Sequence, residues 1–259
     1  MVQVVLPVTK SSNEYNPASA GLFFIMKDLL NRLHNKFAFL RQRIEKKLAQ
    51  DKQALRLFKT CHACNPEQIK QQSIADTRYI VLDTETTGLH AYSGDEIIEI
   101  AMIELRGLKP TGRHYHSMIN PQRPIPAEST AIHHIRDADV ANAPSVQEVL
   151  PEILGFIDNA VLVGHHINFD IRFINKTLQR ICHGRLLNPW LDTMLLYLAF
   201  RGQMGHYALE EVAQHCHVEI RNRHSAEGDA SATAEIFTYL TPRLVRINDT
   251  VGRLVTLQQ

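Results

Sequence analysis

Apolar residues near the N-terminus follow the period of a helix. They recur at spacings of three and four residues at Leu30, Leu33, Phe37, Leu40 and Ile44. Such spacing places side chains on one face of a helix, and Leu48, Leu55 and Phe58 are expected to extend that face. Residues 60–73, with two cysteines and a proline, are interpreted as a turn or linker region. The pattern therefore predicts a helical N-terminal extension over residues 1–75.

From residue 76 onward, short apolar runs suited to buried strands alternate with segments of helical period. The predicted strands are Tyr79–Asp83, Glu96–Leu105, His114–Ile119 and Val161–Val163. The predicted helices are Ser145–Asp158, Phe169–Arg180, Asp192–Phe200, Leu209–His215 and Asp229–Leu240, with another toward the C-terminus. Three early strands followed by alternating units are typical of an α/β domain with a mixed sheet. Residues 76–259 are expected to form that domain.

Charge is distributed unevenly along the chain. The 259 residues carry a formal charge of +1, from 28 basic and 27 acidic residues. The segment from Lys27 to Lys59 contains ten Lys and Arg residues and three Asp and Glu residues, which gives it a charge of +7. The rest of the chain therefore carries a charge of −6. A basic flank beside an acidic domain is compatible with a nucleic-acid enzyme. Three interpretations of the extension stay open: packing on the main domain, docking to a protein partner, and contact with nucleic acid or acidic lipid.

Two features bear on location. No apolar run in the sequence is long enough to cross a bilayer, and the N-terminus lacks the basic start of a secretory signal. The four cysteines follow no disulfide-scaffold pattern at this length, which fits a reducing compartment. A cytoplasmic protein without membrane contact is therefore expected.

Two of the cysteines have the spacing of half a zinc site. Cys61 and Cys64 are separated by two residues, as in many zinc-binding pairs. The remaining cysteines, Cys182 and Cys216, are expected to lie far away inside the other domain. A linker turn is therefore the preferred interpretation of Cys61 and Cys64.

The strongest candidate for chemistry is a pair of carboxylates at the end of the first strand. In the segment 82–89, Asp83 and Glu85 alternate with Thr84, so the two acidic side chains share one face of the strand. Carboxylates forced together repel unless they are protonated or bridged by a cation. Their oxygens are ligands that suit Mg²⁺ or Mn²⁺. Taken alone, the pair also fits a solvated strand end.

Two further acidic residues lie where strands give way to helices. Asp170 follows a strand at residues 161–163, and Asp229 lies near the start of a predicted helix. An Asp at a helix N-terminus is commonly a simple cap, and that interpretation stays open for either residue alone. Four carboxylates, with His224 five positions before the last one, form a more specific set.

Segments 82–89, 162–170 and 224–230 resemble, in order and spacing, the three motifs of the DnaQ-like DEDDh 3′–5′ exonucleases. That family includes the proofreading epsilon subunit of bacterial DNA polymerase III. The resemblance implies a ribonuclease H-like mixed sheet flanked by helices, preceded here by the N-terminal helical extension. It also implies that four residues bind two divalent cations, Mg²⁺ or Mn²⁺. These metal ligands are Asp83, Glu85, Asp170 and Asp229. His224 would be the general base.

Three positions near these motifs each have two interpretations. Thr86 and Thr87 could contact the terminal nucleotide, or they could be ordinary turn residues. His165 could orient Asp170 or contact a substrate phosphate, or it could be a packing residue. The chain also departs from the family pattern, with His166 where Asn is common, His134 where Gly is common and Glu227 where Leu is common. These departures leave the metal ligands and the base in place and bear on substrate preference.

The resemblance implies a metal-dependent enzyme that hydrolyses DNA from the 3′ end and releases 5′-nucleotides. Single-stranded DNA 3′ ends are the expected substrate, in repair, replication or proofreading. Two alternatives stay open: an exoribonuclease of the same superfamily and a non-catalytic nucleic-acid-binding module. A polymerase or another protein could bind through the N-terminal extension.

Overall fold

The computed structural model describes Lys36 and residues 38–259. These residues fall into two compact units, which divide between Ala49 and Gln50. In the first unit, residues 38–47 are helical, as predicted. Leu30, Leu33 and Phe37 lie outside the described residues.

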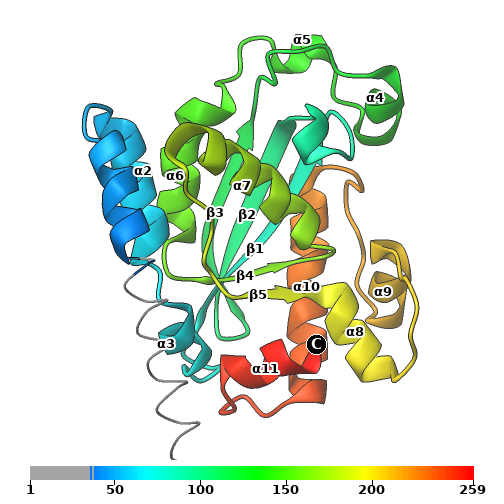
Figure 1. The fold of residues 1–259 in the computed structure, drawn as a ribbon. Helices are drawn as coiled ribbons and strands as arrows, with labels where there is room; N and C mark the ends of the chain where they lie inside the picture. The colour runs from blue at the N-terminus through cyan, green and yellow to red at the C-terminus, as the bar shows by residue number, and fades with distance from the viewer. Residues whose placement is uncertain (1–35, 37) are drawn as a thin grey trace, which may run out of the picture. The chain divides into compact units, whose positions relative to one another are not determined.

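The second unit is built on a five-stranded sheet in the order β3-β2-β1-β4-β5 (Figure 1). Its strands are β1 (Arg78–Thr86), β2 (Ile97–Arg106), β3 (Lys109–Met118), β4 (Val161–Gly164) and β5 (Trp190–Asp192). The pairs β1–β2 and β2–β3 are antiparallel, whereas β1–β4 and β4–β5 are parallel. The prediction of a mixed sheet in an α/β domain is confirmed.

Burial explains which strand lies at the centre. Residues 79–82 of β1 are fully buried, and all four residues of β4 are buried. Such continuous apolar runs suit strands that are covered on both faces. By contrast β3 carries Pro110 and a row of exposed side chains, which suits the edge strand that it forms. The buried run therefore agrees with the central position of β1 in the sheet.

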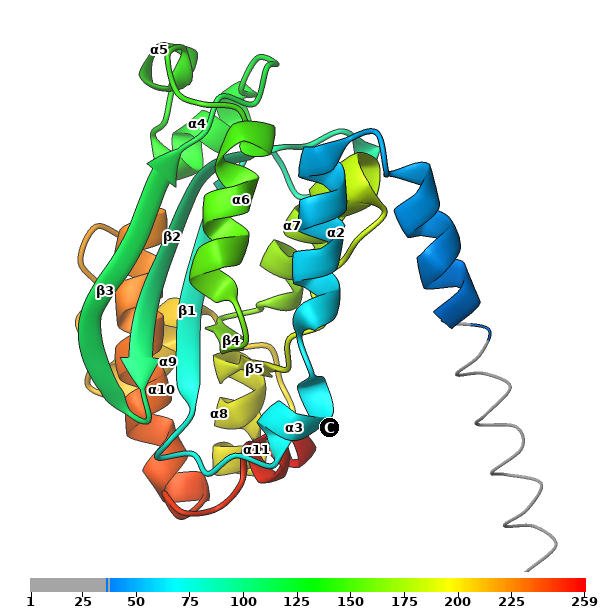
Figure 2. The same ribbon diagram turned by 90° about the vertical axis from the view of Figure 1, so that its left-hand side faces the viewer.

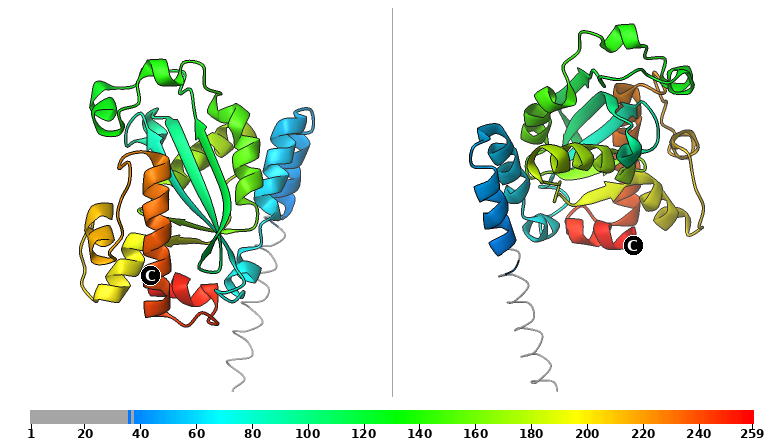
Figure 3. Two further views of the ribbon diagram at one scale, coloured as in Figure 1. Left: turned by 180° about the vertical axis from the view of Figure 1, so that it is seen from behind. Right: turned by 45° about the horizontal axis from the view of Figure 1, so that its top comes forward.

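Helices cover both faces of this sheet (Figure 2). They are α2 (Lys52–Ala63), α3 (Pro66–Lys70), α4 (Ala127–His133), α5 (Asp137–Val140), α6 (Val146–Ile157), α7 (Asn168–Cys182), α8 (Thr193–Arg201), α9 (Leu209–His215), α10 (Ala226–Leu244) and α11 (Val251–Leu257), with a 3₁₀ turn at Ala91–Ser93. The layer of α6 and α7 covers one face, and α10 crosses β1 and β2 on the other, as the left view of Figure 3 shows. No helix among the described residues is long and apolar enough to span a membrane.

The apolar face of the N-terminal helix does not continue to Phe58 as predicted. The chain turns at residues 48–50, and Asp51 begins a separate helix, α2, by accepting a hydrogen bond from the Ala54 amide at 2.9 Å. Phe58 is fully buried, but it belongs to this separate helix. The apolar spacing alone predicts one continuous helix, but the N-cap at Asp51 starts a second one.

The prediction of a linker at residues 60–73 is wrong. Helix α2 runs to Ala63, and α3 follows after Asn65, whose side chain accepts a hydrogen bond from the Gln68 amide at 3.2 Å. Both helices lie in the same compact unit as the sheet, which spans Gln50–Gln259. The division into an extension at 1–75 and a catalytic domain at 76–259 therefore remains a functional proposal.

The expectation that Cys182 lies far from Cys61 is also wrong. Both side chains are buried, and a Cβ atom added to Gly184 would lie 3.0 Å from Cys182 Sγ and 3.2 Å from Cys61 Sγ. A hydrogen bond between the two thiols, together with burial, raises the pKa of Cys61. Cys61 is therefore a packing residue at the contact of α2 with α7.

Candidate active site

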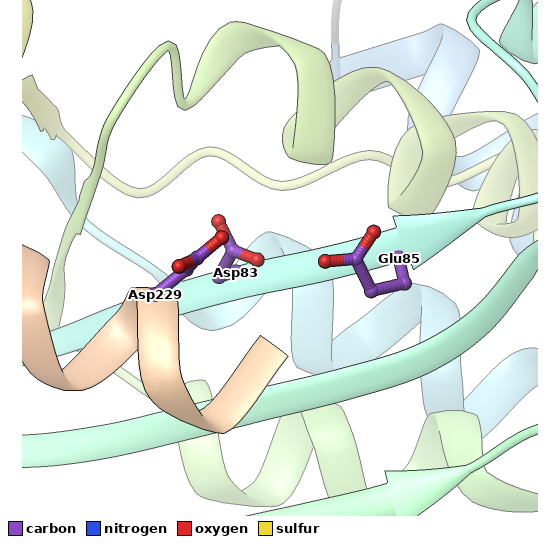
Figure 4. Close-up of side chains that lie close together, drawn as sticks. All are labelled: Asp83, Glu85 and Asp229. Carbon is purple, nitrogen blue, oxygen red and sulfur yellow. The ribbon is translucent and has the colours of Figure 1, made fainter. Parts of the chain in front are cut away.

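The end of β1 presents two carboxylates on one face. Asp83 pairs in register with Ala101 of β2, and Glu85 pairs with Glu99. The alternation of a strand directs both acidic side chains toward α10, which crosses this face. Figure 4 shows Asp83 and Glu85 rising from β1 on the side where Asp229 approaches.

Helix α10 supplies the third carboxylate from its first turn. Ser225 caps the helix by accepting a hydrogen bond from the Gly228 amide at 3.1 Å, and Asp229 follows with 3% exposure. A Cβ at Gly228 would lie 2.2 Å from the Arg221 carbonyl oxygen and 2.4 Å from that of Asn222. Only glycine therefore lets the preceding loop fold so closely against this turn.

Asp83, Glu85 and Asp229 form a compact cluster. One oxygen atom from each lies within 4.8 Å of the others. Asp229 is buried, whereas Asp83 and Glu85 are partly exposed. Three hard oxygen donors at this spacing fit a divalent cation such as Mg²⁺ or Mn²⁺. We call these three side chains the carboxylate cluster.

Asp170 lies beside the carboxylate cluster but is not one of its members. It comes from the first turn of α7, is 3% exposed and accepts a hydrogen bond from Thr84 Oγ1 at 2.6 Å. Its negative charge helps to raise the pKa of Asp83. The structure thus brings Asp170 to the same site, held from the opposite side of β1 by Thr84.

A pocket of about 830 Å³ opens over these side chains. Asp83, Glu85, Asp170 and Asp229 all line it, and so does His224. His224 has a left-handed backbone (φ 63°) two residues before α10 begins. All five residues predicted to be catalytic therefore face one pocket.

Burial and mutual repulsion disfavour the charged forms of the carboxylates. Burial and the charges of Asp170, Asp229 and Glu85 raise the pKa of Asp83 well above its usual value. Burial, followed by the charge of Asp229, raises the pKa of Glu85 to about 8. Burial also raises the pKa of Asp170 to about 7, against the opposing effect of the Thr84 hydrogen bond. The positive charge around these carboxylates is therefore too small to keep their pKa values at the usual level.

Arg223 supplies part of that positive charge. Its Nη1 contacts Asp229 Oδ2, and its Nε donates to Glu210 Oε1 at 2.6 Å. Its charge lowers the pKa of Asp83, Glu85 and Asp229. Arg223 was not among the residues predicted from the sequence, because its contact with Asp229 is visible only in the folded chain.

Comparisons with known proteins agree with this geometry. The RNase_T family model, described as Exonuclease, matches residues 80–237. The chain belongs to this exonuclease family. The match includes Asp83, Glu85, Asp170, His224 and Asp229.

Two curated relatives show how far the similarity extends. The chain is 39% identical over 182 residues to a DNA polymerase III subunit epsilon-like protein of Rhodobacter capsulatus, covering 69% of this chain and 26% of the relative. It is 34% identical over 175 residues to the DNA polymerase III subunit epsilon of Rickettsia typhi, covering 65% and 76%. The chain thus spans about a quarter of the first relative and most of the second.

Solved structures of exonucleases share the fold. Exonuclease X in complex with 5′ overhanging duplex DNA superimposes with a TM-score of 0.54 at 21% identity, covering 70% of this chain and 99% of that one. The predicted ribonuclease H-like architecture is confirmed. Exonucleases of this family depend on divalent metals, and the carboxylate cluster has the donors that such ions require.

The segment 82–89 contains two threonines, Thr86 and Thr87, whose hydroxyl groups form hydrogen bonds within the protein. Thr86 Oγ1 donates to the Gly88 carbonyl at 2.7 Å. Thr87 Oγ1 accepts a hydrogen bond from the Glu96 amide at 3.0 Å. Both residues line the pocket, but their hydroxyl groups hold the turn after β1. Their contact with substrate remains a prediction.

His165 is likewise held by the protein. Its Nδ1 lies 3.0 Å from Thr193 Oγ1 and its Nε2 lies 3.0 Å from the Tyr207 carbonyl oxygen. Burial, aided by the neighbouring His166, lowers the pKa of His165 to about 4. A neutral ring that joins β4 to α8 and to residue 207 is a packing feature, and its contact with phosphate remains a prediction.

The first prediction concerns the stability of the metal-free protein. Folding raises the pKa of Glu85 from 4.5 to about 8, so the native state holds its proton more tightly than the unfolded chain. The free energy of unfolding should therefore fall as pH rises between these two values. We expect the melting temperature in EDTA to decline over this range, and Glu85→Gln to flatten the decline. Glu219→Gln, at a site 79% exposed, is the control. An unchanged slope in Glu85→Gln would contradict the assignment.

The second prediction concerns Arg223. Because its guanidinium contacts Asp229, it competes with a cation for that carboxylate. Arg223→Gln should tighten Mn²⁺ binding by about tenfold, which corresponds to ~1.4 kcal/mol, and should lower the melting temperature of the metal-free protein. Isothermal titration calorimetry measures the affinity. Arg221→Gln removes an equal charge from a side chain that is 83% exposed and should change neither quantity. Equal effects of the two substitutions would show that general charge, and not the contact, is responsible.

Proposed function

We propose that this chain is a metal-dependent 3′–5′ exonuclease that removes 5′-nucleotides from single-stranded DNA. The observation that carries the proposal is the convergence of three carboxylates, Asp170 and His224 on one pocket in a member of the exonuclease family. The names of its relatives support DNA as the substrate, since they include DNA polymerase III epsilon subunits and an exonuclease in complex with DNA.

The four carboxylates have distinct places in the proposed metal site. Asp83, Glu85 and Asp229 would hold one cation within the carboxylate cluster, and Asp170 would help to hold a second. Two bound Mg²⁺ or Mn²⁺ ions supply the charge that activates water and stabilises the leaving oxygen. Loss of the protons that these carboxylates retain in the metal-free state would accompany metal binding.

His224 is the proposed general base. An imidazole can accept a proton near neutral pH, and this one lines the pocket beside Asp229. His224 lies two residues before α10 and Asp229 lies in the first turn of that helix, so the positions of the two residues are linked. The N-terminal end of α10 would thereby position both the proposed base, His224, and one proposed metal ligand, Asp229.

The rim of the pocket suits nucleobases. Leu89 and Ile132 line it and are 75% and 52% exposed, so both present apolar surface at the pocket. Bases present apolar faces, whereas the phosphates require cations such as Arg223 and Arg123, which also line the pocket. The combination favours a single strand whose bases are unpaired.

Residues 1–75 are proposed to contribute strand binding or partner docking and no catalytic group. Every residue of the catalytic set lies within the family match at 80–237. In the described part of the basic segment, Arg41, Arg43 and Lys46 are exposed. Phosphate contacts by such side chains strengthen binding through counterion release. A polymerase subunit is the partner class that the relatives' names favour.

The proposed activity is tested on 5′-labelled oligonucleotides. The purified full chain is incubated with single-stranded DNA, or with RNA of the same sequence, in Mg²⁺, Mn²⁺ or EDTA. We expect a ladder that shortens from the 3′ end of DNA, no cleavage in EDTA and none by Asp83→Asn. Cleavage of RNA alone would replace the proposal with an exoribonuclease. Binding without cleavage under all conditions would leave only a nucleic-acid-binding module.

The next prediction separates the base from the ligands. His224→Ala should lower the cleavage rate by about 10²- to 10⁴-fold, the usual contribution of general acid–base catalysis. Metal affinity should be retained, because the imidazole is assigned to proton transfer. Calorimetry with Mn²⁺ and single-turnover cleavage measure the two quantities. His114→Ala, which alters an exposed histidine of β3, is the control. A collapse of metal affinity in His224→Ala would refute the assigned role.

A further inference from the structure

Glu99 is a buried carboxylate beside the active site that the exonuclease motifs do not include. It is 6% exposed and pairs in register with Glu85 across the antiparallel strands β1 and β2. Its charge contributes to the raised pKa of Glu85. Like charges directly opposite on neighbouring strands are unfavourable. A glutamate at this position therefore requires a compensating interaction.

The compensation comes from two directions. Glu99 Oε2 accepts a hydrogen bond from the Ala226 amide at 3.0 Å, across 127 residues of sequence. Glu99 Oε1 lies 2.7 Å from His116 Nε2 on β3. The side chain thus connects three elements: β2, which carries it, the edge strand β3 and helix α10.

The amide that Glu99 accepts from is the first of α10. Helix N-termini carry amides without partners inside the helix, and a carboxylate there also interacts favourably with the helix dipole. Ser225 caps the amide of Gly228, so the amide of Ala226 is left to Glu99. The N-terminus of α10 is thus capped by Ser225, which directly precedes the helix, and by Glu99 of strand β2.

Close packing makes this contact possible. Ala226 and Ala230 pack on Ala101, and these small side chains let the helix approach β2 closely. His224 lies two residues before Ala226, and Asp229 lies three residues after it. A shift of this first turn would move both side chains relative to Asp83 and Glu85.

We propose that Glu99 is a positioning residue that fixes the start of α10, and with it His224 and Asp229, against the carboxylates of β1. The consequence for catalysis rests on the proposed nuclease function, whereas the contact itself does not. Misplacement of catalytic groups by about 1 Å can cost ~10²-fold in rate. The effect should fall on kcat, since Glu99 does not line the pocket.

Two substitutions separate position from charge. Glu99→Gln removes the negative charge but keeps an oxygen that accepts the Ala226 amide, so kcat should stay within about threefold of the wild type. Glu99→Ala removes the acceptor, and kcat should fall by about 10- to 100-fold with KM nearly unchanged. The matched control is Glu104→Ala on the same strand. Glu104 is also 6% exposed, but it pairs with Arg78 and Arg113 away from the pocket, so its loss should lower the melting temperature and leave kcat unchanged.

Hydrogen exchange at residues 225–229 gives a readout that is independent of activity. In the full chain, Glu99→Ala should speed exchange of the Ala226 amide, whereas Glu99→Gln and Glu104→Ala should not. The proposal is overturned if Glu99→Ala leaves exchange and kcat unchanged, or if Glu99→Gln loses as much kcat as Glu99→Ala. If exchange responds as expected but the wild type cleaves no nucleic acid, the positioning contact stands and the proposed function fails.

Discussion

The crowding of acidic side chains at the end of β1 is the constraint on which the rest of the site depends. Asp83, Glu85 and Asp229 have oxygens within 4.8 Å of one another, and Asp170 and Glu99 add charge from two sides. Such a cluster is stable only with protons, with cationic side chains or with metal ions. The raised pKa values and the contact with Arg223 are the responses of the metal-free protein to this crowding.

The sheet topology explains why these groups meet. Strand β1 has an antiparallel neighbour on one side and a parallel neighbour on the other. Parallel β4 brings the start of α7, with Asp170, to the same end of the sheet, and α10 crosses β1 with Asp229 in its first turn. In open α/β sheets, ligand sites commonly lie outside the carboxyl ends of the strands. Three segments far apart in sequence thus converge at one point.

Much of this arrangement could be predicted from the sequence, because the informative features are local. Asp83 and Glu85 share a strand face through simple alternation, and the period of α6 marked its buried side. The parts that were missed depend on contacts between distant residues. The Glu99 carboxylate meets the Ala226 amide across 127 residues, and Cys61 packs against Cys182. No local pattern indicates such pairs. Strand β5 was not predicted for a different reason, because its three residues are too few to show a period.

Two of the three expected departures from the family pattern, His134 and His166, lie at positions with an unusual backbone conformation. The resemblance described above implies Gly and Asn at these positions, and both histidines have left-handed backbones (φ 62° and 58°). Gly and Asn adopt this conformation readily, and histidine tolerates it better than most residues. His166 lines the pocket, and its ring stacks on His206 with centroids 4.6 Å apart. A histidine at position 166 therefore adds an aromatic ring to the lining of the pocket that Asp83, Glu85, Asp170 and Asp229 also line.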